Sequence, residues 1–207
     1  MRIHPLRFFG VGVAAVALTF AATNHGQIGL AQQAAKIRWD IVTFTSFSPP
    51  TFKDGGATFS WAIDGNYIKV TGSGTFGPGL TDPVTGGGEW ETFDVHNKST
   101  GKGKYTVTRL VSWQEAPGTL PAALIDNIAP KAAARAGLAV VLVAYANVDG
   151  SSGGTGTLVI SCHLPEGSPH SMFEGVIPTK DFVTFYAPVA PMPGVDANRT
   201  VFHRVTM

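Results

Sequence analysis

The sequence predicts an all-β fold, an antiparallel β-barrel of about eight to ten strands, with a β-sandwich as the alternative. Three observations carry this prediction. Short segments alternate between apolar and polar residues, as half-buried strands do. Turn residues separate these segments, and the chain contains 25 glycines and 14 prolines. The one stretch with helical character, residues 121–136, is interrupted by Pro130, so it is expected to form only a short turn or two.

The strands are predicted in chain order from these alternations. Residues 37–41 alternate Ile, Trp and Ile with Arg and Asp. Residues 58–63 alternate in the same way, and Asp64-Gly65 separates them from residues 67–71. An Asp-Gly pair between two such runs predicts a β-hairpin, because tight hairpin turns need positive φ angles. The further predicted strands are 88–95, 104–113, 138–149, 157–164, 172–177, 182–186 and 200–205.

The N-terminal residues predict a cleavable signal peptide over residues 1–31. Arg2 and Arg7 precede an apolar run over residues 8–22, and a polar stretch then leads to a small-residue cleavage site after Ala31. The apolar run is shorter than the ~20 residues of a membrane-spanning helix. An uncleaved anchor is the alternative. We therefore expect residues 32–207 to form one exported domain, secreted or periplasmic, with no stable membrane span after cleavage.

The charge and the cysteine content limit the partners. Of 15 Lys and Arg residues, two lie in the signal peptide, which leaves 13 against 14 acidic residues, a net charge of −1. A nearly neutral chain argues against a nucleic-acid partner, which requires a basic face. Cys162 is the only cysteine, so the predicted core must hold the fold without an internal disulfide. The sequence leaves the oligomeric state open.

One glycine-rich segment resembles a known family. The segment 84–91, Val-Thr-Gly-Gly-Gly-Glu-Trp-Glu, resembles the Thr-Gly-Gly-x-Gly-x-aromatic turn of the allene oxide cyclase and dirigent-like barrels, and residues 72–76 fit the same hairpin. The resemblance implies an eight-stranded antiparallel barrel around an apolar cavity, and it assigns no catalytic residue. The chain is also similar to secreted bacterial proteins with Thr-Gly-Gly-Gly-x-Trp and Ser-Cys-His-Leu-Pro elements (residues 85–90 and 161–165), a likeness that implies no activity.

Arg109 and Glu174 are the candidate catalytic residues, because each falls on an apolar face of its predicted strand. Unbroken alternation from Tyr105 to Trp113 would point Arg109 inward, where a guanidinium needs a carboxylate, an anionic ligand or water. A bulge that turns Arg109 outward is the alternative. Glu174 lies between Met172 and Val176 on one predicted face, where it would act as an acid or base or pair with Arg109.

The aromatic residues supply a possible ligand pocket. Trp90, Trp113 and Tyr145 are predicted to line it together with Arg109 and Glu174, although ordinary core packing is the alternative. Cys162 and His163 are neighbours on a strand and face opposite ways, so Cys162 is expected to be a buried, inert thiol. His163, His170 and Glu174 have the ligand types of a metal site, but no diagnostic spacing, and we expect neither a metal nor a cofactor.

Two classes of function fit these residues. A small barrel can hold one hydrophobic molecule, and this binding role is the first hypothesis. The second is a cyclase or isomerase that acts on an apolar substrate, with Arg109 holding an anionic group and Glu174 moving a proton. A structural or adhesive β domain without a ligand is a third possibility.

Overall fold

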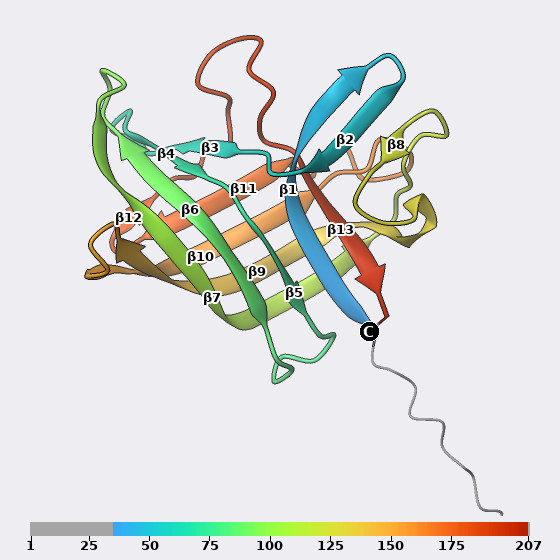
Figure 1. Ribbon diagram of the computed structural model, residues 1–207, viewed down its shortest axis with the longest axis horizontal. Helices are drawn as coiled ribbons and strands as arrows, with labels where there is room; N and C mark the ends of the chain where they lie inside the picture. Colours follow the sequence, from blue (N-terminus) through green and yellow to red (C-terminus); the bar gives the residue numbers. More distant parts are fainter. Residues whose placement is uncertain (1–34, 207) are drawn as a thin grey trace, which may run out of the picture. The chain divides into compact units, whose positions relative to one another are not determined.

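The computed structural model describes residues 35–206, so the predicted signal peptide over residues 1–31 lies outside the described residues. The described chain is all-β, as predicted, with one short 3-10 turn (Figure 1). The elements are β1 (Lys36–Phe47), β2 (Pro50–Asp54), β3 (Thr58–Trp61), β4 (Tyr67–Val70), β5 (Ser73–Phe76), β6 (Thr85–Phe93), β7 (Ser99–Ala116), β8 (Ile125–Asp126), η1 (Lys131–Ala133), β9 (Ala134–Asn147), β10 (Ser152–Cys162), β11 (Gly175–Lys180), β12 (Val183–Thr184) and β13 (Thr200–Val205).

The sheet closes into a ring of antiparallel strands. Starting from β9, each strand pairs with the next in the order β9, β13, β1, β5, β6, β7, and β7 pairs again with β9. The C-terminal strand β13 makes the closure, because it pairs with β1 on one side and with β9 on the other. Figure 1 shows β13 and β1 side by side. Closure removes the open strand edges that would otherwise expose unpaired backbone groups.

A second closure joins β3 to β11 through side chains. The hydroxyl of Ser60 donates a hydrogen bond of 2.6 Å to the carbonyl of Val176, whose N–H donates to Oγ1 of Thr58 at 3.2 Å. Beside these bonds, Trp61 and Ala187 form an isolated backbone bridge. Small hydroxyl side chains therefore satisfy β11 backbone groups where no neighbouring strand does so.

The number of strands exceeds the predicted eight to ten because long strands are interrupted. β4 and β5 run along the same strand, β6, and are separated only at Thr71 and Gly72. The short strands β2 and β8 correspond to no predicted strand, whereas β12 falls within the predicted strand 182–186. The predicted turn within residues 121–136 proves to be β8, η1 and the start of β9. The two segments of the family resemblance, residues 72–76 and 84–91, do lie in one hairpin, with Ser73 opposite Gly87.

Inward-facing side chains fill the ring from two ends. At one end Phe202 packs against Trp113 and Phe76, with ring centroids 4.6 and 6.4 Å apart. At the other end Tyr145 packs against Trp90 and Tyr105, at 5.8 and 6.1 Å. The four tryptophans lie on four different strands, as predicted.

The outer face of β1 and β13 is covered by β2 and β8. There the side chains of Asp126 and His203, both almost fully buried, are hydrogen-bonded, with 2.7 Å between Oδ2 and Nε2. Burial by itself would raise the pKa of Asp126, but the bonds from His203 and from the N–H of Ile128 outweigh it, so the pKa lies below its ordinary value. This pair ties β8 to the closing strand. Within residues 35–206, no helix has the length and apolar character needed to cross a membrane.

The packing of the closing strand leads to a stability prediction. Phe202 is completely buried, so Phe202→Ala should lower the free energy of unfolding by about 3–5 kcal/mol. Phe182, fully exposed in the turn between β11 and β12, supplies the matched control, and Phe182→Ala should change it by less than about 0.5 kcal/mol. Urea unfolding followed by tryptophan fluorescence measures both. Equal losses for the two variants would contradict the assigned role of β13.

Candidate functional site

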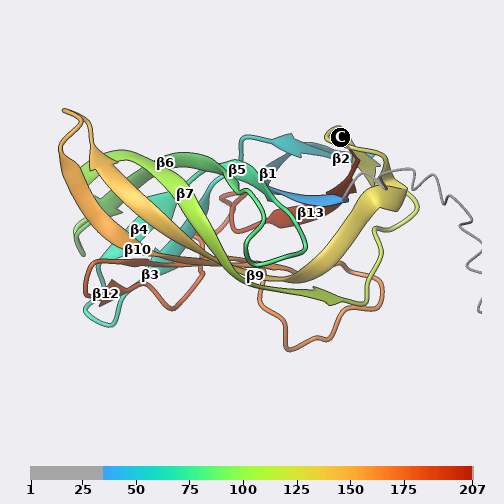
Figure 2. The same cartoon turned by 90° about the horizontal axis from the view of Figure 1, so that it is seen from below.

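A pocket of about 430 Å³ opens at one end of the ring, and we call it the mouth pocket. Four hairpin turns surround it: those between β3 and β4, β6 and β7, β9 and β10, and β11 and β12. Figures 1 and 2 both show these turns gathered at the same end of the sheet. Its lining residues are Asp64, Asn66, Trp90, Thr92, Phe93, Thr100, Gly101, Asn147, Lys180, Asp181, Phe182, Val183 and Phe185.

The distinctive feature of the mouth pocket is an amine above two aromatic rings. The Nζ atom of Lys180 lies 4.8 Å from the centroid of Trp90 and 5.5 Å from that of Tyr145. Both distances are within the range of a cation–π interaction. The register explains the arrangement, because Val176 and Pro178 are buried on the inner face of β11 and Lys180 follows them in the same alternation.

Tyr145, beside this amine, and its neighbour Tyr105 are structural donors. The hydroxyl of Tyr145 donates to the carbonyl of Thr179 at 2.9 Å, and that of Tyr105 donates to the carbonyl of Thr71 at 2.7 Å. Burial raises the pKa of both phenols well above the ordinary value. Both therefore stay protonated at physiological pH and supply no acid–base chemistry.

Lys180 also forms an ion pair with its neighbour Asp181, with 3.2 Å between Nζ and Oδ2. The Lys180 side chain is 17% exposed and that of Asp181 is 45% exposed. Ion pairs this open to solvent contribute only about 0–1 kcal/mol, because water and salt screen them. The ammonium group thus remains able to exchange this partner for an anionic group of a bound molecule.

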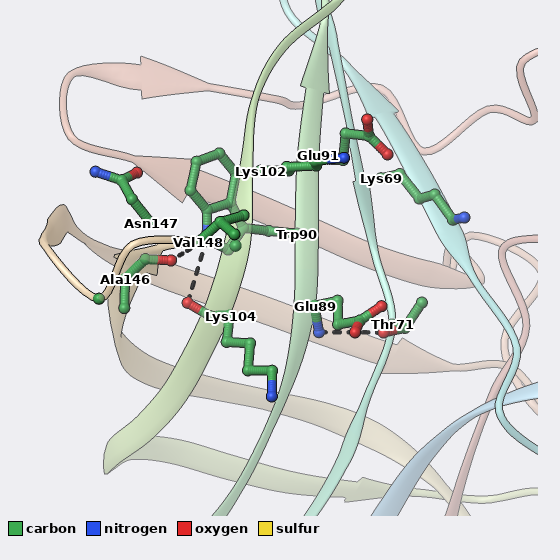
Figure 3. A pocket seen from close by; sticks show the side chains of 12 residues that line it. Lys69, Thr71, Glu89, Trp90, Glu91, Lys102, Lys104, Ala146, Asn147 and Val148 are labelled. Atoms are coloured by element: carbon green, nitrogen blue, oxygen red, sulfur yellow. Dashed lines mark hydrogen bonds between the residues drawn. The ribbon is translucent and has the colours of Figure 1, made fainter.

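A larger groove of about 630 Å³ lies on the outer face of β4, β6 and β7 (Figure 3). Its charges alternate across the strands, with Glu91 opposite both Lys69 and Lys102, and Glu89 opposite Lys104. Opposite charges in such cross-strand positions stabilise a solvated sheet face.

Trp90 borders this groove without presenting its ring to it. Its indole N–H donates to the carbonyls of Lys104 and Ala146 (Figure 3), and the residue is 4% exposed. Gly103, which lies opposite Trp90 on β7, allows this close approach, since a Cβ there would collide with the carbonyl of Ala146. The mouth pocket, which combines apolar surface with an inward-facing charge, is the better candidate site.

Arg109 does not face the interior, because the structure has the alternative in which a β-bulge turns it outward and not the unbroken alternation that would point it inward. The register of β7 against β9 shifts between Val107 and Arg109, so Thr108 is an extra residue at a β-bulge. Such a bulge reverses which face the following residues occupy. Leu110 is buried in place of Arg109, which is exposed beside the turn between β5 and β6.

Glu174 does not lie on a strand face either, because β11 begins at Gly175 rather than at residue 172. The φ angle of Gly175 is +114°, a conformation that glycine tolerates and that turns the chain into the strand. The Glu174 carboxylate accepts hydrogen bonds from the N–H groups of His163, at 2.5 Å, and Thr200, at 2.6 Å. It therefore joins the end of β10 to the start of β13, and it makes no pair with Arg109.

Burial raises the pKa of Glu174 to about 7, although the bonds from Thr200 and His163 act in the opposite direction. His163 and His170 lie close, with ring centroids 6.3 Å apart. Among residues 35–206, no three His, Cys, Asp or Glu side chains are placed to hold a metal ion. Cys162 is completely buried, as predicted, and burial raises the pKa of its thiol.

The structure thus brings two of the five predicted pocket residues together beside Lys180: Trp90, which lines the mouth pocket, and Tyr145, which packs against Trp90. Trp113 lies eight residues beyond Tyr105 on β7, roughly 25 Å along the strand, and packs in the other aromatic group. Sequence reasoning missed Lys180. The available signal was the alternation of Val176, Pro178 and Lys180, which the predicted strand end at residue 177 cut short.

Comparison with protein-family models, with curated proteins and with solved structures finds no match for this chain. The site is therefore interpreted from its own geometry.

The raised pKa of Glu174 predicts a pH dependence of stability. Since the folded protein holds this proton more tightly than the unfolded chain, whose pKa is about 4.5, stability should fall as the pH rises from about 4.5 to 7. Glu174→Gln cannot ionise, so its melting temperature should drop less between pH 5 and pH 8 than that of the wild type, by roughly several degrees.

Glu166→Gln, an exposed change on the same loop, is the control and should keep the wild-type pH dependence. Thermal unfolding followed by circular dichroism at the two pH values measures the difference. An identical drop in Glu174→Gln and the wild type would exclude Glu174 as its source.

Proposed function

We propose that this protein is an exported binding protein that holds a small apolar molecule carrying an anionic group in the mouth pocket. The observation that carries the proposal is the Lys180 ammonium group above Trp90 and Tyr145. An apolar body would lie against the aromatic wall, and its carboxylate or similar group would meet Lys180. The predicted signal peptide supports a secreted or periplasmic location.

Several features of the pocket agree with binding. Ligand sites are concave and mostly apolar, with a few convergent polar groups. Here Phe93, Phe182 and Phe185 supply apolar surface, while Thr92 and Asn147 add polar groups. The resemblance to the allene oxide cyclase and dirigent-like barrels also implies an apolar molecule, but we place it at the mouth of the ring, where Lys180 lies.

The binding hypothesis is favoured over the isomerase hypothesis by the positions of the two residues that catalysis would need. Arg109 is exposed on the outer face of β7. The Glu174 carboxylate, just before β11, accepts hydrogen bonds from two backbone N–H groups. Neither residue lines the mouth pocket. An acid–base role there would require a group within hydrogen-bonding reach of the bound molecule.

The proposal predicts a specific effect on binding of an apolar anion. The fluorescent probe 1-anilinonaphthalene-8-sulfonate combines aromatic rings with a sulfonate, and fluorescence titration measures its affinity. Lys180→Gln should weaken binding about tenfold, since it removes one charge-assisted contact. Lys102→Gln on the outer face of β7 is the matched control and should bind as the wild type does. Equal affinities for the wild type and Lys180→Gln would refute the proposed role of Lys180.

The natural ligand is accessible to a separate measurement. Native mass spectrometry of protein purified from its own compartment should show added mass that denaturing extraction releases, and the extracted molecule should be an amphipathic anion. Extraction of an uncharged molecule would contradict the role of Lys180.

A further inference from the structure

Each of the four turns around the mouth pocket carries a strongly exposed apolar residue at or beside the tip. Ile63 is 90% exposed, Val95 is 54%, Val148 is 74% and Phe182 is fully exposed. They belong to four different hairpins that Figures 1 and 2 show at one end of the sheet. The β3–β4 and β6–β7 turns are in close contact, because a Cβ on Gly65 would lie 3.0 Å from a side-chain carbon of Val95. We call these four residues the apolar tips.

Each apolar tip is the direct neighbour of an aspartate: Asp64, Asp94, Asp149 and Asp181. Three of these carboxylates are directed back into their own hairpins, and the fourth, that of Asp181, accepts from the N–H of Thr155 on β10 at 3.2 Å. Asp64 accepts from the N–H of Asn66 at 3.0 Å, Asp94 accepts from those of His96 and Lys98 at 2.9 Å, and Asp149 accepts from that of Ser151 at 2.9 Å. The apolar side chains therefore project from turns whose polar groups are already satisfied, and nothing in the hairpin geometry requires them to be apolar.

We propose that the apolar tips dock this end of the protein onto a phospholipid bilayer rich in zwitterionic headgroups with an exposed ammonium group, such as phosphatidylethanolamine. Four side chains on separate turns, spread around an open pocket, leave no continuous patch for the packed core that protein interfaces possess. A deformable lipid interface accepts each tip separately, and affinity then grows with the apolar area that is inserted.

The charges beside the tips select the type of bilayer. The four aspartates face only Lys98 and Lys180 as cations on the same turns, so this end carries a net negative charge. Bonds from their own turns lower the pKa of Asp94 and Asp149, which keeps them ionised. The negative charge of these four aspartates repels anionic headgroups, whereas the ammonium group of a zwitterionic headgroup pairs with their carboxylates.

Docking in this orientation places the mouth pocket at the bilayer surface. An apolar ligand would then enter from the lipid without crossing water. The docking proposal rests on the apolar tips and not on Lys180. Phe182 belongs both to the tips and to the lining of the mouth pocket, so Lys180→Gln is the variant that separates docking from ligand binding.

Vesicle co-sedimentation tests the proposal. Wild-type protein should bind vesicles of phosphatidylethanolamine and phosphatidylcholine, and it should bind phosphatidylcholine vesicles containing phosphatidylglycerol more weakly. The double variant Val148→Ser/Phe182→Ser should lose at least about tenfold in affinity, because it removes two inserted side chains. Adding Ile63→Ser and Val95→Ser should abolish binding. All samples carry the same N-terminus, verified by intact mass, so that residues outside the tips contribute equally.

Leu80→Ser is the matched control, since Leu80 is 58% exposed in the turn at the opposite end of β6. It should bind vesicles as the wild type does, and so should Lys180→Gln, even where that variant has lost the fluorescent anion. Absence of wild-type binding, stronger binding to the anionic vesicles, or equal loss in Leu80→Ser would overturn the proposal. Sedimentation velocity tests whether a second copy of the chain binds the apolar tips instead of a bilayer. A dimer that dissociates in Val148→Ser/Phe182→Ser would assign the tips to that second copy.

Discussion

The pairing of β13 between β1 and β9 is the interaction on which the rest of the structure depends. β13 lies at the end of the chain, and its partner β1 is the first strand described, so closure joins the two ends of the fold. Its alternating side chains serve both faces. Phe202 enters the aromatic group with Trp113 and Phe76, and His203 reaches outward to Asp126 on β8. β13 thus pairs with two strand edges, adds Phe202 to the core and anchors β8 on the outer face.

Closure also explains why the two ends of the ring differ. At the end held by β13, the ring of Phe202 packs among its aromatic neighbours. At the other end β3 and β11 meet through Thr58 and Ser60, and four hairpin turns extend beyond the packed interior. Lys180 lies where the inner face of β11 reaches this more open end, with aromatic surface below it and the turns around it. The mouth pocket is consequently a product of how the sheet closes, and the apolar tips lie at the same end because the turns do.

Buried polar groups in this protein join segments rather than perform chemistry at the mouth. Glu174 links the ends of β10 and β13 by accepting backbone N–H groups, and Asp126 links β8 to β13. Glu174 directly precedes β11, and its hydrogen bonds replace those that a neighbouring strand would provide, whereas Asp126 lies on β8, which pairs with β2. A sequence pattern cannot distinguish such a carboxylate from a catalytic one, because both occur among apolar residues.

Much of the fold was predictable because alternation along a strand reports directly on burial. It correctly predicted an all-β protein, the hairpin at Asp64-Gly65 and the burial of Cys162. The errors arose where a single residue changed the alternation. The bulge at Thr108 turned Arg109 outward, and the start of β11 at Gly175 removed Glu174 from the strand. One inserted residue exchanges the two faces, and nothing in the local composition of β7 signals it.

The sequence by itself determined most of the long strand segments and that Trp90 and Tyr145 face inward, since both properties follow from the two-residue period of a β-strand. Only the tertiary structure decided which inward residues become neighbours. Trp90, Tyr145 and Lys180 come from β6, β9 and β11, and their meeting depends on strand order and register across the closed sheet. The same dependence separated Trp113 from the mouth pocket. The physical reason is that a strand's period specifies the face of each side chain, whereas pairing between distant segments specifies its position along the ring.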